Sequence, residues 1–590
     1  MKQLLLLLSL AFAMNANAQV AVNTDGTLPD NSAMLDVKST AKGFLPPRMT
    51  TLQRNAIAAP AAGLVVFDTD VNSLFTRTSS AWVQMGTAST WGLTGNTGTN
   101  SAINYIGTSD NTDLIFRRNT VLAGYIGFDN ISLGVNALNP ATSASYCTAI
   151  GSKALYSNTS GSQNTSVGAE TLFSNSSGMN NTAAGYWALY SNSTGSHNTA
   201  IGVASLYYNT TGSYNTAYGH LSLRFNTIGY QNTAIGDNTL YRNTEGSNNT
   251  AHGCQSLYNN TTGSLNTASG YQSLNMNTTG YQNTACGSLA LQQNTTGFNN
   301  CAIGYVSLLS NTTGIENTST GVAALYYNSV GNYNTAAGRE ALVANITDLN
   351  TAVGYHASHT TNSGFQNTAI GANSLVNNTT GSYNTALGNN TGPNSTNWSN
   401  TTCIGMDATA TATDMVRIGN VYVNSIGGQV GWTTLSDGRF KENVKEDVPG
   451  LAFISQLRPV TYQLNRELVN DFTGVYRRKQ EQAKENLNGL STYKTDALSE
   501  TTTGFIAQEV ESAAKNIGYT FSGVDSPKNE KDIYGLRYDE FVVPLVKAVQ
   551  ELNQQNETLM DSVKIEQQTN DELKRQIAQL LLRIEKLEIK

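Results

Sequence analysis

The side chains with the clearest chemical potential lie in one short segment, Ser-Asp-Gly-Arg-Phe-Lys-Glu-Asn-Val at positions 436–444. Ser436 supplies a hydroxyl nucleophile, and Lys441 supplies an amine that can accept the hydroxyl proton once it is neutral. The hydroxyl can reach the carbonyl of Leu435 through a five-membered ring, so proximity replaces a substrate pocket. The amine becomes neutral where it is desolvated or lies near another cation, and Arg439 is the candidate cation. The segment therefore contains a candidate nucleophile and a candidate base five residues apart.

The spacing of the two groups limits how they can meet. Residues five positions apart do not share one face of a straight helix, so Ser436 and Lys441 need a turn between them, or a neighbouring subunit must complete the site. Taken alone, a serine followed by a lysine at this distance is most simply an ordinary pair in a charged surface loop. The elements around the pair therefore decide between the two interpretations.

The middle of the chain is a repeat of short units. The phrase Asn-Thr-Ala-x-Gly recurs every seventeen residues, as at Asn181, Asn198 and Asn215, and each unit is approximately NTAxGxxxLxxNTTGxx. The period is too short for two helices, and its Thr and Gly content disfavours a helix, so each unit is predicted to be one coil of a parallel β-solenoid. Fainter copies extend over 130–405 with one deletion near Asp348, and roughly 17 coils would make a rod about 80 Å long.

Stacked coils place each repeat position above its equivalent in the next coil. The Leu positions then form a continuous apolar ladder, the Ala positions let backbones approach closely, and the Gly and Asn positions are expected at corners where a positive φ is favourable. Asn side chains can also pair from coil to coil. The fold is therefore predicted to be mainly β, and a thin roll with little core of its own favours association of several chains along its length.

The segments on either side of the repeats differ from them in composition. More than half of the charged residues lie beyond Leu435, which marks a second kind of domain with mixed α/β structure. The segment Gly63–Met85 alternates like a β-hairpin with its turn near Asp70–Ser73. The predicted division is a signal peptide at 1–18, an N-terminal β attachment or capping region at 19–91, a transition at 92–129, the repeats at 130–405, a connector at 406–435, a charged α/β domain at 436–545 and a coiled coil at 546–590.

The last of these segments carries a heptad pattern. One heptad position holds Val542, Val549, Asn556, Val563, Asn570, Ile577 and Ile584, and the other holds Leu545, Leu552, Leu559, Glu566, Leu573, Leu580 and Leu587. This pattern is typical of a coiled coil. The two Asn would fix register and oligomer state at some cost in stability. Self-association is thus predicted independently of the repeats.

The segment around Ser436 belongs to a longer set of motifs. It is followed by Leu457–Tyr462 (LRPVTY), Gly504–Val510 (GFIAQEV) and a helix start at Tyr538–Leu552. In this order the motifs resemble the intramolecular chaperone domain of phage endosialidases and other tail spikes, serine peptidase family seventy-four, whose members cut their own chain with a Ser-Lys dyad. The resemblance implies that Ser436 is the nucleophile and Lys441 the general base, and that the bond cut is the one between Leu435 and Ser436. It also assigns supporting positions within the matched motifs to Asp437, Arg439, Asn443, Gln508 and Glu509.

Two further resemblances concern the rest of the chain. The repeats resemble the YadA-like head of trimeric autotransporter adhesins, which implies a left-handed parallel β-roll and a homotrimer, although the period differs and no autotransporter anchor is seen. The phrases at Ser32–Thr40 and Gly43–Thr51 resemble the leading segment of tail-fibre-like surface proteins of bacteria. These resemblances suggest the class of protein, a bacterial surface fibre, and do not imply a chemical activity.

The charge and hydropathy of the chain limit the classes of partner that it is expected to have. The net charge is -7 and 13% of the residues are charged, which gives no basic face for nucleic acid. Lys2, the apolar run Leu4–Ala13 and the small residues Ala16 and Ala18 predict a signal peptide removed before Gln19, hence a secreted or cell-surface protein. No later apolar stretch is long enough for a membrane span.

No metal and no cofactor are predicted. His356 and His359 have no third ligand at a suitable spacing, so both are expected to be surface histidines. Acidic residues in the repeats are too scattered for a calcium ladder. The five cysteines lie at different repeat positions and are expected to be fillers and not bridges.

The preferred hypothesis is a secreted trimeric fibre whose C-terminal domain chaperones assembly and then cuts itself off between Leu435 and Ser436. The alternative is a non-cleaving adhesin with a permanent C-terminal trimer clamp. In either case the outer partner is expected to be a glycan or a cell-surface ligand. A polysaccharide-degrading enzyme is disfavoured because it needs paired carboxylates, which the repeats lack.

Overall fold

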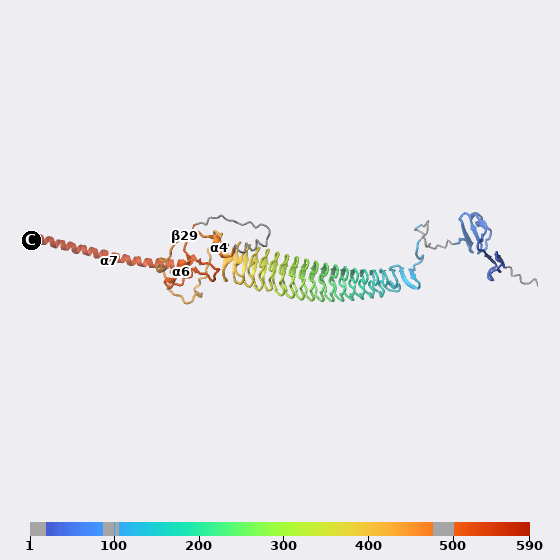
Figure 1. Cartoon of the computed structure of the whole chain (residues 1–590), viewed down its shortest axis with the longest axis horizontal. Coiled ribbons are helices and arrows are strands. Elements are labelled where there is room, and N and C mark those ends of the chain that lie inside the picture. The colour runs from blue at the N-terminus through green and yellow to red at the C-terminus, as the bar shows by residue number, and fades with distance from the viewer. Residues whose placement is uncertain (1–18, 86–99, 101–104, 476–500, 590) are drawn as a thin grey trace, which may run out of the picture. The chain divides into compact units, whose positions relative to one another are not determined.

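The computed structural model describes residues 19–85, 100, 105–475 and 501–589. The chain divides into two compact units, Met1–Ser109 and Asp110–Lys590. In Figure 1 the first unit is dark blue, and the coils of the second run from cyan to orange. The predicted signal peptide at 1–18 lies outside the described residues. Within the described ranges, no helix has the length and apolar character needed to cross a membrane.

The first unit contains two small sheets. Strand β1 (Val20–Asn23) pairs in parallel with β2 (Leu35–Lys38). A four-stranded sheet has the order β3 (Arg48–Met49), β4 (Val65–Asp68), β5 (Ser73–Arg77) and β6 (Trp82–Gln84), and helix α2 (Thr51–Asn55) follows β3. Strands β4 and β5 are antiparallel neighbours joined by a short turn, so the predicted hairpin is confirmed.

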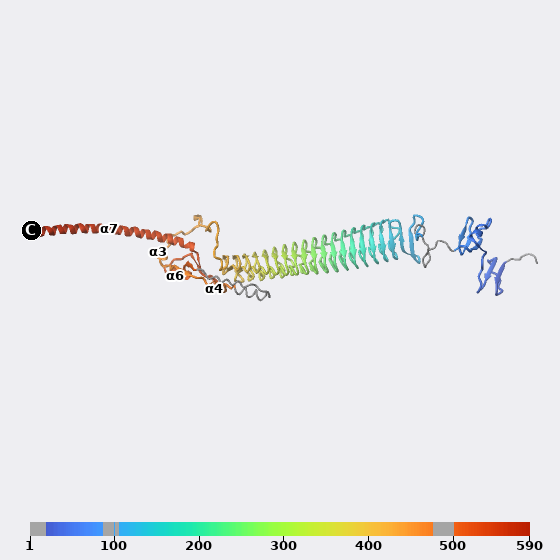
Figure 2. The same cartoon turned by 90° about the horizontal axis from the view of Figure 1, so that it is seen from above.

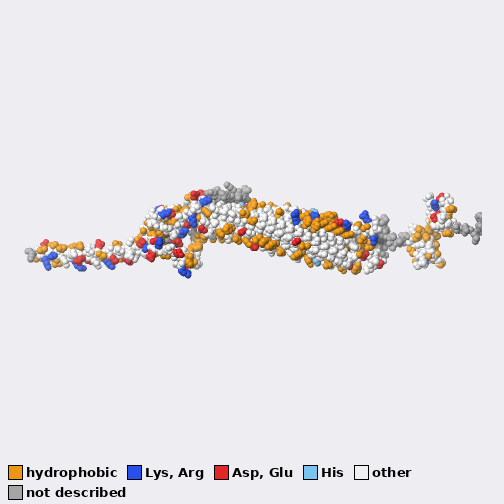
Figure 3. All heavy atoms as spheres, turned by 90° about the horizontal axis from the view of Figure 1, so that it is seen from below, with side chains coloured by type: hydrophobic (Ala, Val, Ile, Leu, Met, Phe, Trp, Pro, Cys, Tyr) orange, Lys and Arg blue, Asp and Glu red, His pale blue; other side chains and the backbone are white. Residues whose placement is uncertain are grey.

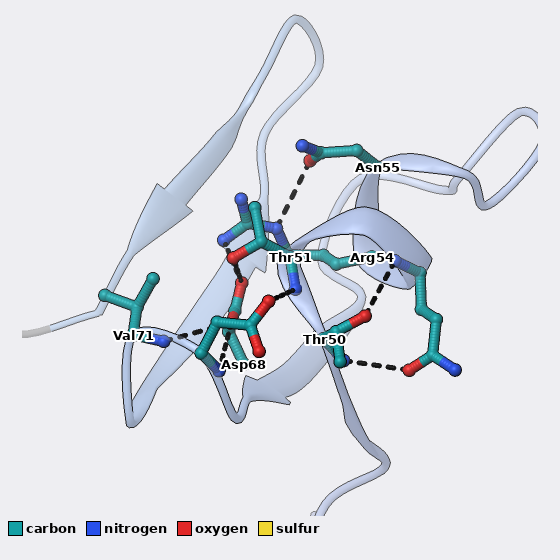
Figure 4. A network of polar contacts seen from close by, with 8 residues as sticks. Thr50, Thr51, Arg54, Asn55, Asp68 and Val71 are labelled. Carbon is teal, nitrogen blue, oxygen red and sulfur yellow. Dashed lines mark hydrogen bonds and ion pairs between the residues drawn. The ribbon is translucent and has the colours of Figure 1, made fainter.

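A buried ion pair links α2 to the four-stranded sheet (Figure 4). Arg54 Nη1 lies 3.0 Å from Asp68 Oδ2, and the Asp68 side chain is 0% exposed. The guanidinium also lies over the ring of Phe75, 3.8 Å from its centroid. Burial opposes ionisation of Asp68, but hydrogen bonds from the Thr51 hydroxyl and from the backbone N–H groups of Val71 and Asp70, together with the Arg54 charge, outweigh it and lower the pKa of Asp68.

Substitution of Asp68 should destabilise the four-stranded sheet of this unit. Asp68→Asn leaves Arg54 buried without its counter-charge, so we expect faster hydrogen exchange across β3–β6 in the full chain at neutral pH. Because the folded pKa is lowered, the carboxylate stabilises the wild-type unit above about pH 4 and loses this effect as the pH falls through the folded pKa. Exchange corrected for its intrinsic pH dependence measures both effects. The control is Asp25→Asn, which removes an exposed 3.7 Å pair with Lys38 and should change little.

The second unit is built on a parallel β-solenoid. Each coil contributes one short strand, and each strand pairs in register with its equivalent in the next coil, as in Thr182↔Thr199. Most paired residues of neighbouring coils are 17 positions apart in the sequence, as Thr318 and Thr335 are. At Thr335↔Thr351 this separation is 16 positions, which confirms the predicted deletion. The strands of this ladder are β9 (Ile131–Leu133), β10 (Thr148–Ile150), β11 (Thr165–Val167), β12 (Thr182–Ala184), β13 (Thr199–Ile201), β14 (Thr216–Tyr218), β15 (Thr233–Ile235), β16 (Thr250–His252), β17 (Thr267–Ser269), β18 (Thr284–Cys286), β19 (Cys301–Ile303), β20 (Thr318–Thr320), β21 (Thr335–Ala337), β22 (Thr351–Val353), β23 (Thr368–Ile370), β24 (Thr385–Leu387), β26 (Thr402–Ile404) and β28 (Val416–Ile418).

Equivalent residues form ladders inside the solenoid. The Ala at the centre of most strands and the repeated Leu are fully buried, as Ala217 and Leu223 are, so the apolar ladder is confirmed. Side-chain amides also pair between coils, with Asn192 Nδ2 donating to Asn175 Oδ1 at 2.7 Å. A second Asn ladder joins coils through the backbone, since the N–H of Asn198 donates to Asn181 Oδ1 at 3.0 Å. Hydrogen bonds therefore satisfy most of the buried polar side chains of the repeat, with exceptions such as Asn378 Oδ1.

The corners of the coil differ in part from the expectation. The Gly that follows each strand has a positive φ, as Gly219 does at 133°, in agreement with the prediction. The two buried Asn of each repeat do not occupy such corners. The other positive-φ positions include the buried Leu, with Leu206 at 50° and Leu223 at 50°. The apolar ladder and the coil-to-coil hydrogen bonds hold these leucines in a conformation that L-residues ordinarily avoid.

Substitution of a corner glycine should destabilise the solenoid. A Cβ added at Gly219 would lie 2.3 Å from the carbonyl oxygen of Gly236 in the next coil. We expect Gly219→Ala to lower the thermal unfolding midpoint, because backbone strain alone costs about 1–3 kcal/mol and the clash adds to it. The control is Gly427→Ala, where nothing lies within 4 Å of the added Cβ. Equal midpoints for the two variants in differential scanning calorimetry would contradict the role of the glycine corner.

Both ends of the solenoid carry additional structure. Strands β7 (Leu114–Arg118) and β8 (Val121–Ile126) form a hairpin, and β8 pairs antiparallel with β9, so the predicted transition contains a cap over the first coil. At the other end β28 pairs with β26, so the ladder continues past the predicted limit at residue 405. Two short strands, β25 (Gly392–Pro393) and β27 (Thr409–Ala410), pair beside it. These pairings cover edges that would otherwise remain open.

A small α/β domain follows the solenoid and continues into one long helix (Figure 2). Its core comprises Phe453, Val510, Ala513, Ala514, Phe521 and Phe541. The elements are η1 (Gly438–Phe440), α3 (Leu451–Ile454), β29 (Val460–Tyr462), α4 (Arg466–Phe472), β30 (Thr502–Gly504), α6 (Ala507–Asn516), β31 (Val524–Asp525), β32 (Gly535–Leu536), η2 (Tyr538–Phe541) and α7 (Val542–Glu588). The predicted mixed domain is therefore present. Figure 3 shows charged side chains sparsely over the coils and densely over this domain and α7.

Candidate functional site

The structure brings Ser436 and Lys441 together. Lys441 Nζ donates a hydrogen bond to Ser436 Oγ at 2.8 Å. The intervening residues form the single turn η1, with Asp437 as its N-cap accepting the backbone N–H of Arg439 at 2.9 Å. Lys441 ends the turn in an extended conformation. A short turn therefore supplies the proximity that a straight helix could not.

Arg439 has a different partner from the one expected. Its Nη2 and Nε lie 2.6 and 3.0 Å from Asp437 Oδ2, so its charge is compensated by Asp437 and is not available to Lys441. The side-chain and backbone hydrogen bonds of Arg439 lower the pKa of Asp437, and the same side-chain bond raises the pKa of Arg439. Within one chain, Asp437 and Arg439 hold the turn and do not act on the lysine.

The remaining predicted positions fall into two places. Asn443 has a φ of 56°, which asparagine tolerates well, and it redirects the chain after the turn. Gln508 and Glu509 begin α6, where Glu509 forms an ion pair with Arg458 at 2.5 Å. In the part of the chain that the structure describes, no hydrogen bond or ion pair joins either of them to Ser436 or Lys441. Glu509 therefore takes part in an ion pair on the surface of the domain, and Gln508 contributes to the lining of a cavity of about 790 Å³.

The Ser436–Lys441 pair lies in an exposed apolar segment. Both side chains are exposed. Around them Trp432 is 86% exposed, Leu435 80% and Phe440 71%. Large apolar side chains on both sides of one bond are unusual on a solvent-facing segment and mark an interaction surface. The described part of a single chain therefore leaves the lysine without the water-excluded surroundings that a lysine base needs.

Helix α7 presents a second uncovered apolar surface. From Leu552 to Ile589 every residue is exposed. Both heptad positions are therefore uncovered, as at Leu573, Ile577 and Leu580, which are 52%, 50% and 56% exposed. The predicted coiled coil is thus a single helix in one chain, with an apolar seam available to other helices.

The expectation of two surface histidines without a third ligand is wrong. His356 is buried, and its Nε2 lies 2.9 Å from Glu340 Oε2. His359 Nε2 lies 3.4 Å from the same oxygen. Glu340 occupies the equivalent position to His356 in the preceding coil, which has one residue fewer. Counting the coil offset through the deletion would have revealed this neighbour from the sequence.

The comparisons with known proteins match two regions of the chain. Residues 21–102 match the family model described as the phage tail like trimerisation region. Residues 436–519 match the family model described as the chaperone of endosialidase, and this match begins at Ser436. Comparison with curated proteins found no match.

The two matched regions flank the solenoid, and the trimerisation region supports self-association as a homotrimer. The chain therefore carries a region similar to the phage tail like trimerisation region, a long β-solenoid and a C-terminal region similar to the chaperone of endosialidase.

Proposed function

We propose that this protein is a secreted, adhesin-like trimeric fibre whose C-terminal domain guides assembly and then cuts the chain between Leu435 and Ser436. The observation that carries the proposal is the 2.8 Å contact between Lys441 Nζ and Ser436 Oγ at the first residue of the matched chaperone region. The signal-peptide pattern supports export. Glycans or cell-surface molecules are the proposed outer ligands of the fibre.

The proposed cleavage proceeds in two steps. The Lys441 amine takes the Ser436 hydroxyl proton while Oγ attacks the carbonyl carbon of Leu435, forming a five-membered ring. The C–N bond then breaks, the nitrogen receives a proton, and an ester joins the Leu435 acyl group to Ser436 Oγ. Water hydrolyses this ester, giving a carboxylate at Leu435 and a free amine at Ser436 with its hydroxyl restored. No cofactor is required, and each chain reacts once.

Assembly is proposed to activate the reaction. Trp432, Leu435 and Phe440 are exposed in one chain, and their burial against neighbouring subunits would desolvate Lys441 and disfavour its charged form. The requirement for a covered site would delay cleavage until three chains have met. A premature cut would separate the chaperone from a solenoid that has not yet formed.

The solenoid benefits from such a chaperone for a kinetic reason. All coils of its ladder are parallel, and each depends on a neighbour for its hydrogen bonds, so the first coils form slowly and expose edges that favour aggregation. A trimer held at its C-terminal end raises the local concentration of the three strands that must start together. After release of the chaperone, the fibre would unfold slowly because its assembly route is gone.

One observation favours the alternative of a permanent clamp. The domain contacts the last coils of its own chain, since Thr411 Oγ1 lies 2.5 Å from Asp532 Oδ1 and Asn394 Nδ2 donates to the Thr473 carbonyl at 3.1 Å. These contacts would retain the domain on the solenoid in an uncut chain. The uncut protein would then be an adhesin-type binding fibre with a fixed trimeric end.

Denaturing electrophoresis of the purified mature protein, with N-terminal sequencing of every band, distinguishes the two hypotheses. Self-cleavage predicts a C-terminal fragment that begins SDGRFK. A single full-length band from a native trimer would overturn the cleavage proposal and favour the clamp. A full-length band from a monomer would overturn the assembly proposal as well, so native mass measurement accompanies the gel.

A further inference from the structure

Glu340, His356 and His359 form a cluster on the outer part of two neighbouring coils. One ligand atom from each residue lies within 4.8 Å of the others. The two closest pairs are Glu340 Oε2 with His356 Nε2 at 2.9 Å and with His359 Nε2 at 3.4 Å. Ligands of a tetrahedral zinc ion lie about 3.3 Å from one another, because each is about 2.0 Å from the metal. The three atoms therefore stand close to a ligand arrangement already.

The residues around the cluster hold its members in place. Arg339 Nε lies 3.0 Å from Glu340 Oε1, which leaves Oε2 directed toward the histidines. The Tyr355 ring stacks on the His356 ring with centroids 3.8 Å apart. The His356 side chain is only 9% exposed, whereas those of Glu340 and His359 are 23% and 32% exposed. One fixed and two accessible ligands would leave a path for an ion and room for water as a fourth ligand.

The cluster lies where the internal ladders of the solenoid are weakest. Elsewhere the Asn side-chain ladder has spacings such as 2.7 Å between Asn277 and Asn260, but Asn328 to Asn311 and Asn345 to Asn328 are 3.5 and 3.4 Å. The coil with the two histidines also has Ser358 and Thr361 at the buried Leu and Asn positions, and their hydroxyls bond to each other at 2.6 Å. Toward the preceding coil, this coil thus lacks the Leu and Asn side chains of the repeat, whereas Thr361 Oγ1 still donates to the Asn378 carbonyl of the following coil at 3.2 Å.

We propose that Glu340, His356 and His359 bind a divalent transition metal of the zinc class and clip these two coils together. Two imidazole nitrogens and one carboxylate oxygen match the ligand preference of Zn²⁺ and Co²⁺ and do not match the all-oxygen preference of Ca²⁺ or Mg²⁺. The ion would join one coil to the next across the deletion. It would thereby replace the Leu and Asn contacts that the second coil has lost.

The test is titration of the full-length protein, under reducing conditions, with Zn²⁺ by calorimetry and with Co²⁺ by visible absorption. Wild type should bind one ion per chain at this site, with a Co²⁺ spectrum that lacks a thiolate charge-transfer band. Glu340→Gln and His359→Asn should each weaken binding at least about 10-fold. Zn²⁺ should raise the unfolding temperature of the wild type and not that of the two variants.

A matched control is available in the same solenoid. His220 Nδ1 and Asp237 Oδ1 lie 2.9 Å apart on neighbouring coils, and the described residues offer them no third ligand. His220→Asn should therefore leave metal binding unchanged. Three results would overturn the proposal. The wild type could fail to bind the metal, or Glu340→Gln and His359→Asn could bind it as tightly as the wild type does. The third is that His220→Asn weakens binding as much as these two variants do. Far-UV circular dichroism without metal verifies that each variant is folded.

Discussion

Replacement of Ser436 by alanine should leave every chain at full length. The variant lacks the hydroxyl that is proposed to attack the preceding carbonyl, so we expect the rate of cleavage to fall by at least about 1,000-fold. Lys441→Ala should have a similar effect, because its amine is the group 2.8 Å from the hydroxyl oxygen. The rate is measured by densitometry of the fragment beginning SDGRFK over time after assembly.

Two controls separate chemistry from folding. Lys445→Ala removes an exposed lysine four positions beyond Lys441 and should leave cleavage unchanged. Native mass measurement should show trimers for Ser436→Ala and Lys441→Ala, because neither side chain lies in a core. Normal cleavage by a trimeric Ser436→Ala variant would show that another group carries the reaction. Loss of cleavage in Lys445→Ala alone would place the base elsewhere in the segment.

The solenoid was predictable because its sequence and structure share one period. Each repeat position stacks on its equivalent, so a column of Leu or Ala in the sequence becomes a buried ladder such as Leu206 on Leu223. The Asn pairing follows from the same argument. What the sequence could not indicate is the φ of 50° at these leucines. Intrinsic preference assigns such corners to Gly or Asn, but the stacked neighbours decide, and they exist only in the folded array.

Features outside the repeat period were harder to foresee. The hairpin of β7 and β8 has no repeat partner, so its pairing with β9 is a tertiary contact without a sequence signal. The proximity of Glu340 to the two histidines depends on a coil that is one residue short, and the regular spacing hides it. The Ser436–Lys441 contact was expected, yet the Asp437–Arg439 pair beside it was not. The turn at 438–440 brings the Arg439 side chain next to Asp437, and the sequence alone did not indicate which of its neighbours Arg439 would pair with.

Charges introduced into the seam of α7 should abolish the trimer. Ile577 and Leu580 are about half exposed in one chain and stand at the two apolar heptad positions. In a three-helix coiled coil, Ile577 and Leu580 would each be buried against the same residue of the other two helices. The double variant Ile577→Asp, Leu580→Asp therefore places six carboxylates in two adjacent layers of the apolar core. Desolvation and mutual repulsion then oppose association, and we expect monomers by analytical ultracentrifugation at micromolar concentration. Self-cleavage should stop as well, since it is proposed to require assembly.

The control for this double variant is Gln579→Glu, which adds a charge between the two positions but outside the seam. It should remain a trimer and should cut normally. If the double variant stayed trimeric and uncut, the helix would serve cleavage but not association, and the N-terminal trimerisation region at 21–102 would hold the chains. If it were monomeric and still cut at Leu435–Ser436, one chain would contain the complete site. The burial of Trp432, Leu435 and Phe440 by neighbouring subunits would then be unnecessary for the reaction, and assembly and cleavage would be independent events.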